Sequence, residues 1–173
     1  GDYYGAWRAM ERLYREGAVR AIGVSNFTPE RLVDLCMNQE FKPMVNQIEI
    51  HPFFQQNTAL RVMEDYGVVP QAWGPLSEAQ KDIFNHKTLA KIADRHGKTA
   101  AQVILRWHLQ RKIPTIPKTV HRGRMAENLD VFDFELTAKE MESIAGMDIG
   151  HSEIIDHHCF CTARQLNSVK IHR

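Results

Sequence analysis

Four short groups of polar or aromatic residues each follow an apolar run in this sequence. They are Ser25 and Asn26; Gln47, Glu49 and His51; Trp73, Gly74, Pro75, Leu76 and Ser77; and Lys118 and Thr119 with Arg124, Glu127 and Asn128. Amides beside a hydroxyl can satisfy the donors and acceptors of a carboxamide, and an aromatic face can stack on a planar ring. The first three groups therefore predict a site for a nicotinamide ring.

The last group carries the charge that a phosphate would need. Lys118 and Arg124 lie on either side of a predicted helix start, where cationic side chains and backbone N–H groups together suit a phosphate. The four groups together predict a phosphorylated dinucleotide that is bound in an extended form.

Each group also has a simpler interpretation, which its residues alone leave open. Ser25 and Asn26 fit a loop that caps a helix, and a single tryptophan such as Trp73 is more often part of a core. Lys118 and Arg124, taken singly, fit solvated surface charges. A ligand site requires the fold to bring these groups together.

Short apolar runs alternate with helical patterns along the chain. The predicted strands are residues 21–24, 44–50, 68–73 and 114–117. The predicted helices are 6–16, one beginning at Pro29, 58–66, 86–95, 99–110, 122–129 and one beginning after Thr137. Thr28 before Pro29 is typical of a helix start, and Thr137 with Glu140 three residues later predicts a capping box.

Strands that alternate with helices predict parallel βα units, either in an open doubly wound sheet or in a (β/α)8 barrel. Neither the G-x-G-x-x-G fingerprint nor a P-loop is present, so the open sheets that cradle phosphates have no support. A complete barrel takes about 250 residues and eight strands, and this chain has roughly half of each. We therefore predict an α/β fold that forms half of a (β/α)8 barrel, with about four parallel βα units and its site at the carboxyl ends of the strands.

The composition argues against several classes of partner. The chain has 173 residues with 22 Lys and Arg against 21 Asp and Glu, so no overall basic field favours nucleic acid or an anionic membrane. No apolar run approaches the ~20 residues that span a bilayer, and residues 1–4 do not resemble a signal peptide. Three cysteines fit reduced thiols better than a disulfide framework, which favours the cytoplasm. Gly1 in place of Met suggests a trimmed chain.

Four motifs in a fixed order resemble the aldo-keto reductase family over nearly the whole chain. They are IGVSNF at 22–27, NQIE at 46–49, WGPL at 73–76 and IPKT at 116–119. The resemblance implies that residues 1–150 form the C-terminal half of the family's TIM-type barrel and that residues 151–173 are a divergent tail. It also implies an NADPH-dependent reductase of aldehydes and other carbonyl compounds.

The resemblance assigns a cofactor role to each polar group. The residues that would bind the nicotinamide carboxamide are Ser25, Asn26 and Gln47. The ring would stack on Trp73, where many members of the family have Tyr. The pyrophosphate would lie along Gly74, Pro75, Leu76 and Ser77. The 2′-phosphate of NADPH would contact Lys118, Thr119 and Arg124, and the adenine would contact Glu127 and Asn128.

In this family a Tyr donates the proton to the carbonyl with the help of an Asp, a Lys and a His, and the resemblance places all four before residue 1. Residues 1–7 resemble the segment that follows the catalytic His, and Tyr3, Tyr4 and His51 match other positions. We therefore identify no catalytic residue here and predict that the chain is inactive alone, because a missing general acid commonly costs ~10²- to 10⁴-fold in rate. With half of the barrel mouth absent, we also expect the chain alone to bind the cofactor poorly if at all.

After Asp156 and His157 the sequence departs from the Arg-Asp-Pro that usually follows in the family. The possible soft metal ligands in this segment are His151, His157, His158, Cys159 and Cys161. Their spacing matches no C-x-x-C or H-x₃-H pattern, so we expect no specific metal site. A disordered tail or adventitious metal affinity is the expected alternative. The departure leaves open the shape of the carbonyl pocket, which this segment helps to form in the family.

Two functions remain in competition. The favoured one is the C-terminal half of an NADPH-dependent carbonyl reductase with a small-molecule substrate. The alternative is a non-catalytic module that binds a dinucleotide or a partner protein, because a half-barrel has unpaired strand edges, here at 21–24 and 115–117. These edges predict a homodimer or a separate N-terminal half as partner, unless the tail covers the open face.

Overall fold

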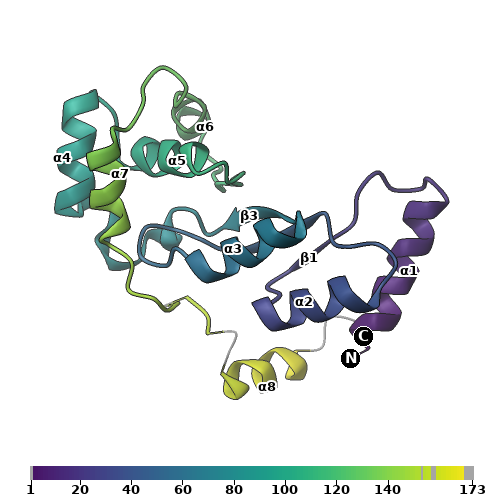
Figure 1. Cartoon of the computed structure of the whole chain (residues 1–173). Coiled ribbons are helices and arrows are strands. Elements are labelled where there is room, and N and C mark those ends of the chain that lie inside the picture. The colour runs from purple at the N-terminus through teal and green to yellow at the C-terminus, as the bar shows by residue number, and fades with distance from the viewer. Residues whose placement is uncertain (1, 153, 157–158, 170–173) are drawn as a thin grey trace.

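The computed structural model describes residues 2–152, 154–156 and 159–169, and it has an α/β architecture (Figure 1). The helices are α1 (Tyr3–Arg15), α2 (Pro29–Asn38), α3 (Asn57–Tyr66), α4 (Lys87–His96), α5 (Ala100–Gln110), α6 (Arg122–Leu129), α7 (Ala138–Ala145) and α8 (Phe160–Ser168). A 3₁₀ segment, η1, spans Ser77–Asn85. The strands are β1 (Gly23–Ser25), β2 (Val45–Glu49) and β3 (Val69–Trp73). The predicted alternation of strands and helices is confirmed.

The three strands form one parallel sheet in the order β1-β2-β3. The predicted fourth strand, 114–117, is reduced to a single parallel bridge between Ala72 and Thr115. The N–H of Ala72 donates to the carbonyl of Pro114 at 2.8 Å. Pro114 and Pro117 have no N–H to donate, so this segment cannot extend a ladder in both directions. The parallel direction of the strands was predicted correctly, whereas the predicted length of the last strand was wrong.

The main core lies between the sheet and helices α3, α4 and α5. Ile48 of β2, Met63 of α3 and Trp107 of α5 are all at most 3% exposed. Burial of such a side chain contributes about 1.5–3 kcal/mol. Because successive side chains of a strand point to opposite faces, Ile48 in the core directs Gln47 and Glu49 away from these helices.

A smaller core joins α1 to α2 beside β1. Trp7, Ile22 and Leu35 are buried there. The indole N–H of Trp7 donates to the carbonyl of Phe41 at 3.1 Å, so the polar atom of this large side chain is satisfied. Figure 1 shows α1 and α6 at opposite sides of the molecule.

The predicted starts of α2 and α7 agree with the structure, whereas α1 begins at Tyr3 and not at residue 6, because the Asp2 side chain caps the helix earlier. Pro29 opens α2 after Thr28, although the Thr28 side chain makes no capping hydrogen bond. Thr137 and Glu140 form the predicted capping box of α7, and Glu140 also lies 3.1 Å from His96 of α4. Burial opposes ionisation of Glu140, but the backbone N–H of Thr137 and the His96 ring outweigh it and lower the pKa of Glu140 to about 2.

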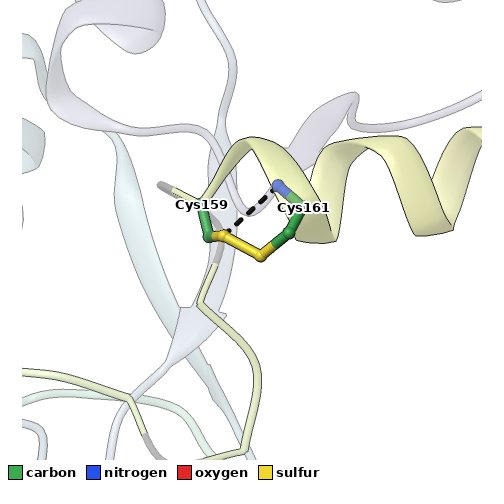
Figure 2. The surroundings of a disulfide bond; sticks show 2 residues. All are labelled: Cys159 and Cys161. Carbon is green, nitrogen blue, oxygen red and sulfur yellow. Dashed lines mark hydrogen bonds between the residues drawn. A yellow bond between two sulfur atoms is a disulfide. The ribbon is translucent and has the colours of Figure 1, made fainter.

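The tail differs from its prediction. Residues 160–168 form α8 in place of the disordered tail, and Cys159 and Cys161 form a disulfide at its start (Figure 2). Their Cα atoms are 5.2 Å apart, a separation that suits a disulfide. The expectation of reduced thiols is therefore wrong for this pair, and only Cys36, which is buried, keeps its thiol.

Other expectations for the tail fall partly outside the structure. His157 and His158 lie outside the described residues. Within the part of the chain that the structure describes, no three His, Cys, Asp or Glu side chains gather as a metal site requires. None of the described helices has the length and apolar character to cross a membrane.

Candidate functional site

The carboxyl ends of β1, β2 and β3 lie at one edge of the sheet. Ser25 lies opposite Gln47 in the parallel register, and its hydroxyl donates to the Gln47 carbonyl oxygen at 3.0 Å. The backbone N–H of Asn26 donates to the same oxygen at 2.9 Å. The end of the β1–β2 ladder therefore holds the predicted Ser25-Asn26 pair next to Gln47.

Asn26 and Trp73 meet through their side chains although they lie 47 residues apart in the sequence. The indole N–H of Trp73 donates to Asn26 Oδ1 at 2.7 Å. Asn26 has a φ of 55°, in the left-handed region that Asn tolerates better than most residues. The tryptophan thus fixes the direction of the Asn26 carboxamide.

Gln47 has a partner that the sequence analysis missed. Its Nε2 donates to Gln71 Oε1 at 2.6 Å, and the two glutamines are opposite each other in the β2–β3 register. The sequence did contain a signal for this partner. Gln71 lies two residues before Trp73 in the same strand, so the side chains of Gln71 and Trp73 point to the same face of the sheet.

These residues form a polar edge that suits one kind of ligand. The hydroxyl of Ser25 and the amides of Asn26 and Gln47 supply donors and acceptors for a carboxamide, and Trp73 supplies an aromatic face for a planar ring. The indole N–H occupies one of the two acceptor positions of Asn26 Oδ1, so a ligand amide there would share that oxygen.

The next group, 74–77, forms a tight turn directly after β3. The N–H of Ser77 donates to the carbonyl of Gly74 at 2.8 Å. Gly74 has a φ of 56°, which favours glycine, and a Cβ at this position would lie 3.6 Å from Ile154 Cδ1 in the C-terminal segment. The turn therefore packs closely against the chain that follows α7.

The cationic group lies on a different element. Lys118 and Thr119 precede α6, and Arg124 is in its first turn. Thr119 Oγ1 accepts the N–H of His121 at 3.1 Å, which shapes the entry to the helix. Lys118 and Arg124 are both exposed, and in the sequence they lie on either side of the first residue of α6. Two cations at a helix N-terminus suit a phosphate.

Glu127 has a structural contact besides its predicted role at the adenine. Its Oε1 accepts the hydroxyl of Thr99 at 2.6 Å, and its carbonyl accepts Nε2 of Gln102 at 3.2 Å. These bonds attach α6 to the first turn of α5. The adenine contacts of Glu127 and Asn128 stay predictions.

A buried carboxyl and imidazole pair lies at the end of β2. Glu49 and His51 are each 2% exposed, and His51 Nε2 lies 2.9 Å from Glu49 Oε1. Ser152, which the sequence analysis did not single out, donates its hydroxyl to Glu49 Oε2 at 2.6 Å. A pocket of about 590 Å³ opens here, and Asn26, Glu49 and Ser152 are part of its lining.

His108 of α5 is a second buried histidine. Burial, reinforced by the charge of Arg111, lowers the pKa of His108 to about 3. Its ring is therefore neutral at neutral pH.

Comparison with known proteins identifies relatives that carry the same fold. The chain matches the Aldo/keto reductase family over residues 2–149. Glyoxal reductase of Bacillus subtilis (strain 168) is 44% identical over 146 residues, which cover 84% of this chain and 52% of that protein. Methylglyoxal reductase DkgA of Escherichia coli (strain K12) is 39% identical over 148 residues, 86% of this chain and 54% of that protein.

A solved structure gives the same result in three dimensions. The crystal structure of a Gox0644 mutant in complex with NADPH superposes with a TM-score of 0.79 at 42% identity, covering 82% of this chain and 52% of that chain. This chain spans about half the length of the curated relatives it matches. Because the parallel sheet, the ordered motifs and these relatives agree, the chain belongs to the aldo/keto reductase family.

Proposed function

We propose that this chain provides the cofactor-binding half of an NADPH-dependent reductase of small carbonyl compounds. The observation that carries the proposal is the convergence of Ser25, Asn26 and Gln47 with Trp73 at one strand edge. The Gox0644 mutant, which is 42% identical to this chain over the part that aligns, is in complex with NADPH. Bound NADPH supplies a hydride for a carbonyl carbon.

At the nicotinamide end, the chain binds and orients the ring. Ser25, Asn26 and Gln47 hydrogen-bond to the carboxamide, and Trp73 stacks on the ring. The bond from Trp73 to Asn26 orients the amide before a ligand arrives, which reduces the entropy lost on binding.

At the phosphate end, the chain contributes backbone and positive charge. The residues we assign to the pyrophosphate are Gly74, Pro75, Leu76 and Ser77. The residues we assign to the 2′-phosphate are Lys118, Thr119 and Arg124, with Glu127 and Asn128 at the adenine. Since NADH lacks the 2′-phosphate, these cations favour NADPH.

Reduction of a carbonyl also requires a proton donor for its oxygen, and Tyr3 and Tyr4 at the start of α1 are the tyrosines to consider. Tyr3 and Tyr4 both donate to Asp34 Oδ2 of α2, Tyr3 at 2.6 Å, and this carboxylate raises the pKa of both phenols. These tyrosines therefore attach α1 to α2 and are poor proton donors. We propose that the donor lies outside these residues and that the chain alone does not reduce carbonyls.

The names of two relatives support a proposal for the substrate class. Two of them are named as reductases of glyoxal and methylglyoxal, which are small dicarbonyl compounds. We propose a small aldehyde or dicarbonyl as the substrate of the complete site.

The sheet edge supports a second candidate, a binding module that pairs with another chain. Among the described residues, β1 pairs with β2 alone, and Gly23 and Ser25 of this edge are exposed. An unpaired edge is a template for a further strand. We propose pairing with a second copy or with an N-terminal half. Sedimentation equilibrium at micromolar concentration should show a homodimer, and a monomer that unfolds cooperatively would contradict it.

A cofactor titration tests the main proposal. We expect the emission of NADPH to change saturably on addition of the chain, with weaker binding of NADH, because the exposed cations favour the extra phosphate. AMP, which has neither nicotinamide nor 2′-phosphate, is the control ligand and should compete poorly. Absence of saturable binding for both dinucleotides at millimolar concentration would contradict the proposal.

A further inference from the structure

Glu49, at the end of β2, is bound from two sides. Its Oε1 lies 2.9 Å from Nε2 of His51, and its Oε2 accepts the hydroxyl of Ser152 at 2.6 Å. A buried carboxylate is unfavourable unless its oxygens are hydrogen-bonded. His51 belongs to the same strand end, whereas Ser152 comes from 103 residues further along the chain. The second oxygen therefore depends on the position of the C-terminal segment.

Ser152 also folds the segment that carries it. Its Oγ accepts the N–H of Ile154 at 3.1 Å and the N–H of Ile155 at 2.9 Å. One hydroxyl thus joins two backbone amides of the segment to the buried carboxylate. Loss of this oxygen would release the local turn and the attachment to β2 together.

The approach to Ser152 is fixed as well. The N–H of Ile149 donates to the carbonyl of Phe53 at 2.8 Å. Asp148 Oδ1 accepts the N–H of Gly150 at 3.0 Å, and Gly150 has a φ of 74°, which favours glycine in this turn. The chain after α7 is therefore directed onto the end of β2.

Beyond Ser152, the segment reaches the proposed cofactor site. Ile154 Cδ1 lies 3.6 Å from the place that a Cβ would take at Gly74, the first residue of the turn that we assign to the pyrophosphate. Ser152 and Ile155 line the pocket of about 590 Å³ that also includes Asn26. The segment thus lines the pocket beside Asn26 and lies next to the turn that we assign to the pyrophosphate.

We propose that Ser152 and Glu49 are positioning residues that hold residues 150–152 and 154–156 as a fixed wall over the strand ends. The wall rests on the contacts above, and its effect on the cofactor rests on the function proposed for Gly74 and Asn26. By covering the turn after β3, the wall slows release of a bound dinucleotide.

Hydrogen exchange by mass spectrometry on the whole chain without cofactor tests the wall. In Ser152→Ala, the amides of Ile154 and Ile155 should exchange about fivefold to tenfold faster, as expected for loss of a local hydrogen-bonded turn. Ser152→Thr, which keeps the hydroxyl, should restore most of the protection. Ser143→Ala is the matched control, because its exposed hydroxyl bonds only within α7. Unchanged exchange in Ser152→Ala, or faster exchange that extends to α3 and α5, would overturn the proposal.

The release rate of NADPH tests the positioning role. A chase with excess unlabelled ligand should show release about fivefold faster from Ser152→Ala than from Ser143→Ala, with Ser152→Thr near the original rate. Equal release rates would overturn the positioning role even if exchange changes. If the original chain binds no NADPH, the proposed function fails, and the exchange experiment still decides whether the wall exists.

Discussion

The strand-end group and the α6 group differ in how their side chains are held. Asn26 and Gln47 lie in a network of side-chain and backbone hydrogen bonds that joins β1, β2 and β3. By contrast, no residue of α6 is buried, and Lys118 and Arg124 extend into solvent. One region is ordered by its own hydrogen bonds, and the other presents solvent-exposed charge.

This difference predicts two kinds of contribution to binding. A fixed hydrogen-bonding edge selects a ligand by shape and acts on every dinucleotide that carries a nicotinamide. Exposed cations attract the negative charge of the ligand and should therefore strengthen the binding of ligands that carry the extra phosphate. This contribution to binding should fall strongly as the salt concentration rises. The following experiments test whether the two regions separate in this way.

The largest expected effect concerns a group that neither region supplies. Since no general acid is identified, turnover of NADPH with glyoxal or methylglyoxal should fall at least ~10²-fold below the ~10 s⁻¹ typical of enzymes. NADPH absorbance measures it, with a full-length relative as positive control. Turnover near the typical value would show that this chain contains a proton donor.

Removal of a cation should affect one cofactor only. Arg124→Ala should weaken NADPH binding by about 1.5–3 kcal/mol, the scale of a charge-assisted hydrogen bond. The binding free energy of NADH should change by no more than about 0.5 kcal/mol, because NADH lacks the 2′-phosphate. Equilibrium titration at low salt measures both. Arg122→Ala, an exposed arginine of the same helix, is the control and should change neither. Equal losses for both cofactors would place Arg124 away from the 2′-phosphate.

Acid should weaken the contact between α7 and α4 through a single carboxylate, that of Glu140. Because the folded-state pKa of Glu140 is lowered to about 2 from 4.5, its contribution is complete above pH 4.5 and is lost as the pH falls toward 2. Glu140→Gln should reduce the free energy of unfolding at pH 7 by about 1.5 kcal/mol. Urea unfolding at several pH values measures it, with the exposed Glu142→Gln as control. An unchanged acid dependence in Glu140→Gln would refute this assignment.

The smallest expected effect comes from the strand-end group. Asn26→Gly tolerates the positive φ and removes the amide, so NADPH and NADH should both weaken by about 1 kcal/mol. The same titration measures this, and Asn38→Gly, at the exposed end of α2, is the control. A loss confined to NADPH would mean that the two regions do not separate as proposed.

Local signals in the sequence predicted much of the fold. The bounds of α6, 122–129, were predicted as observed, as were the opening of α2 at Pro29 and the capping box of Thr137 and Glu140. These features depend on side chains and backbone groups within one helical turn of each other. A window of a few residues in the sequence therefore contains all the groups that determine them.

The sequence by itself determined the order of elements, the family motifs and the residue types at the strand ends. Only the tertiary structure decided which of these side chains meet: Trp73 with Asn26, Gln47 with Gln71, and Ser152 with Glu49. It also reduced 114–117 to one bridge and gave the tail a helix. These contacts join residues far apart in the chain, and their geometry depends on how the strands align and the helices pack, which no local pattern encodes.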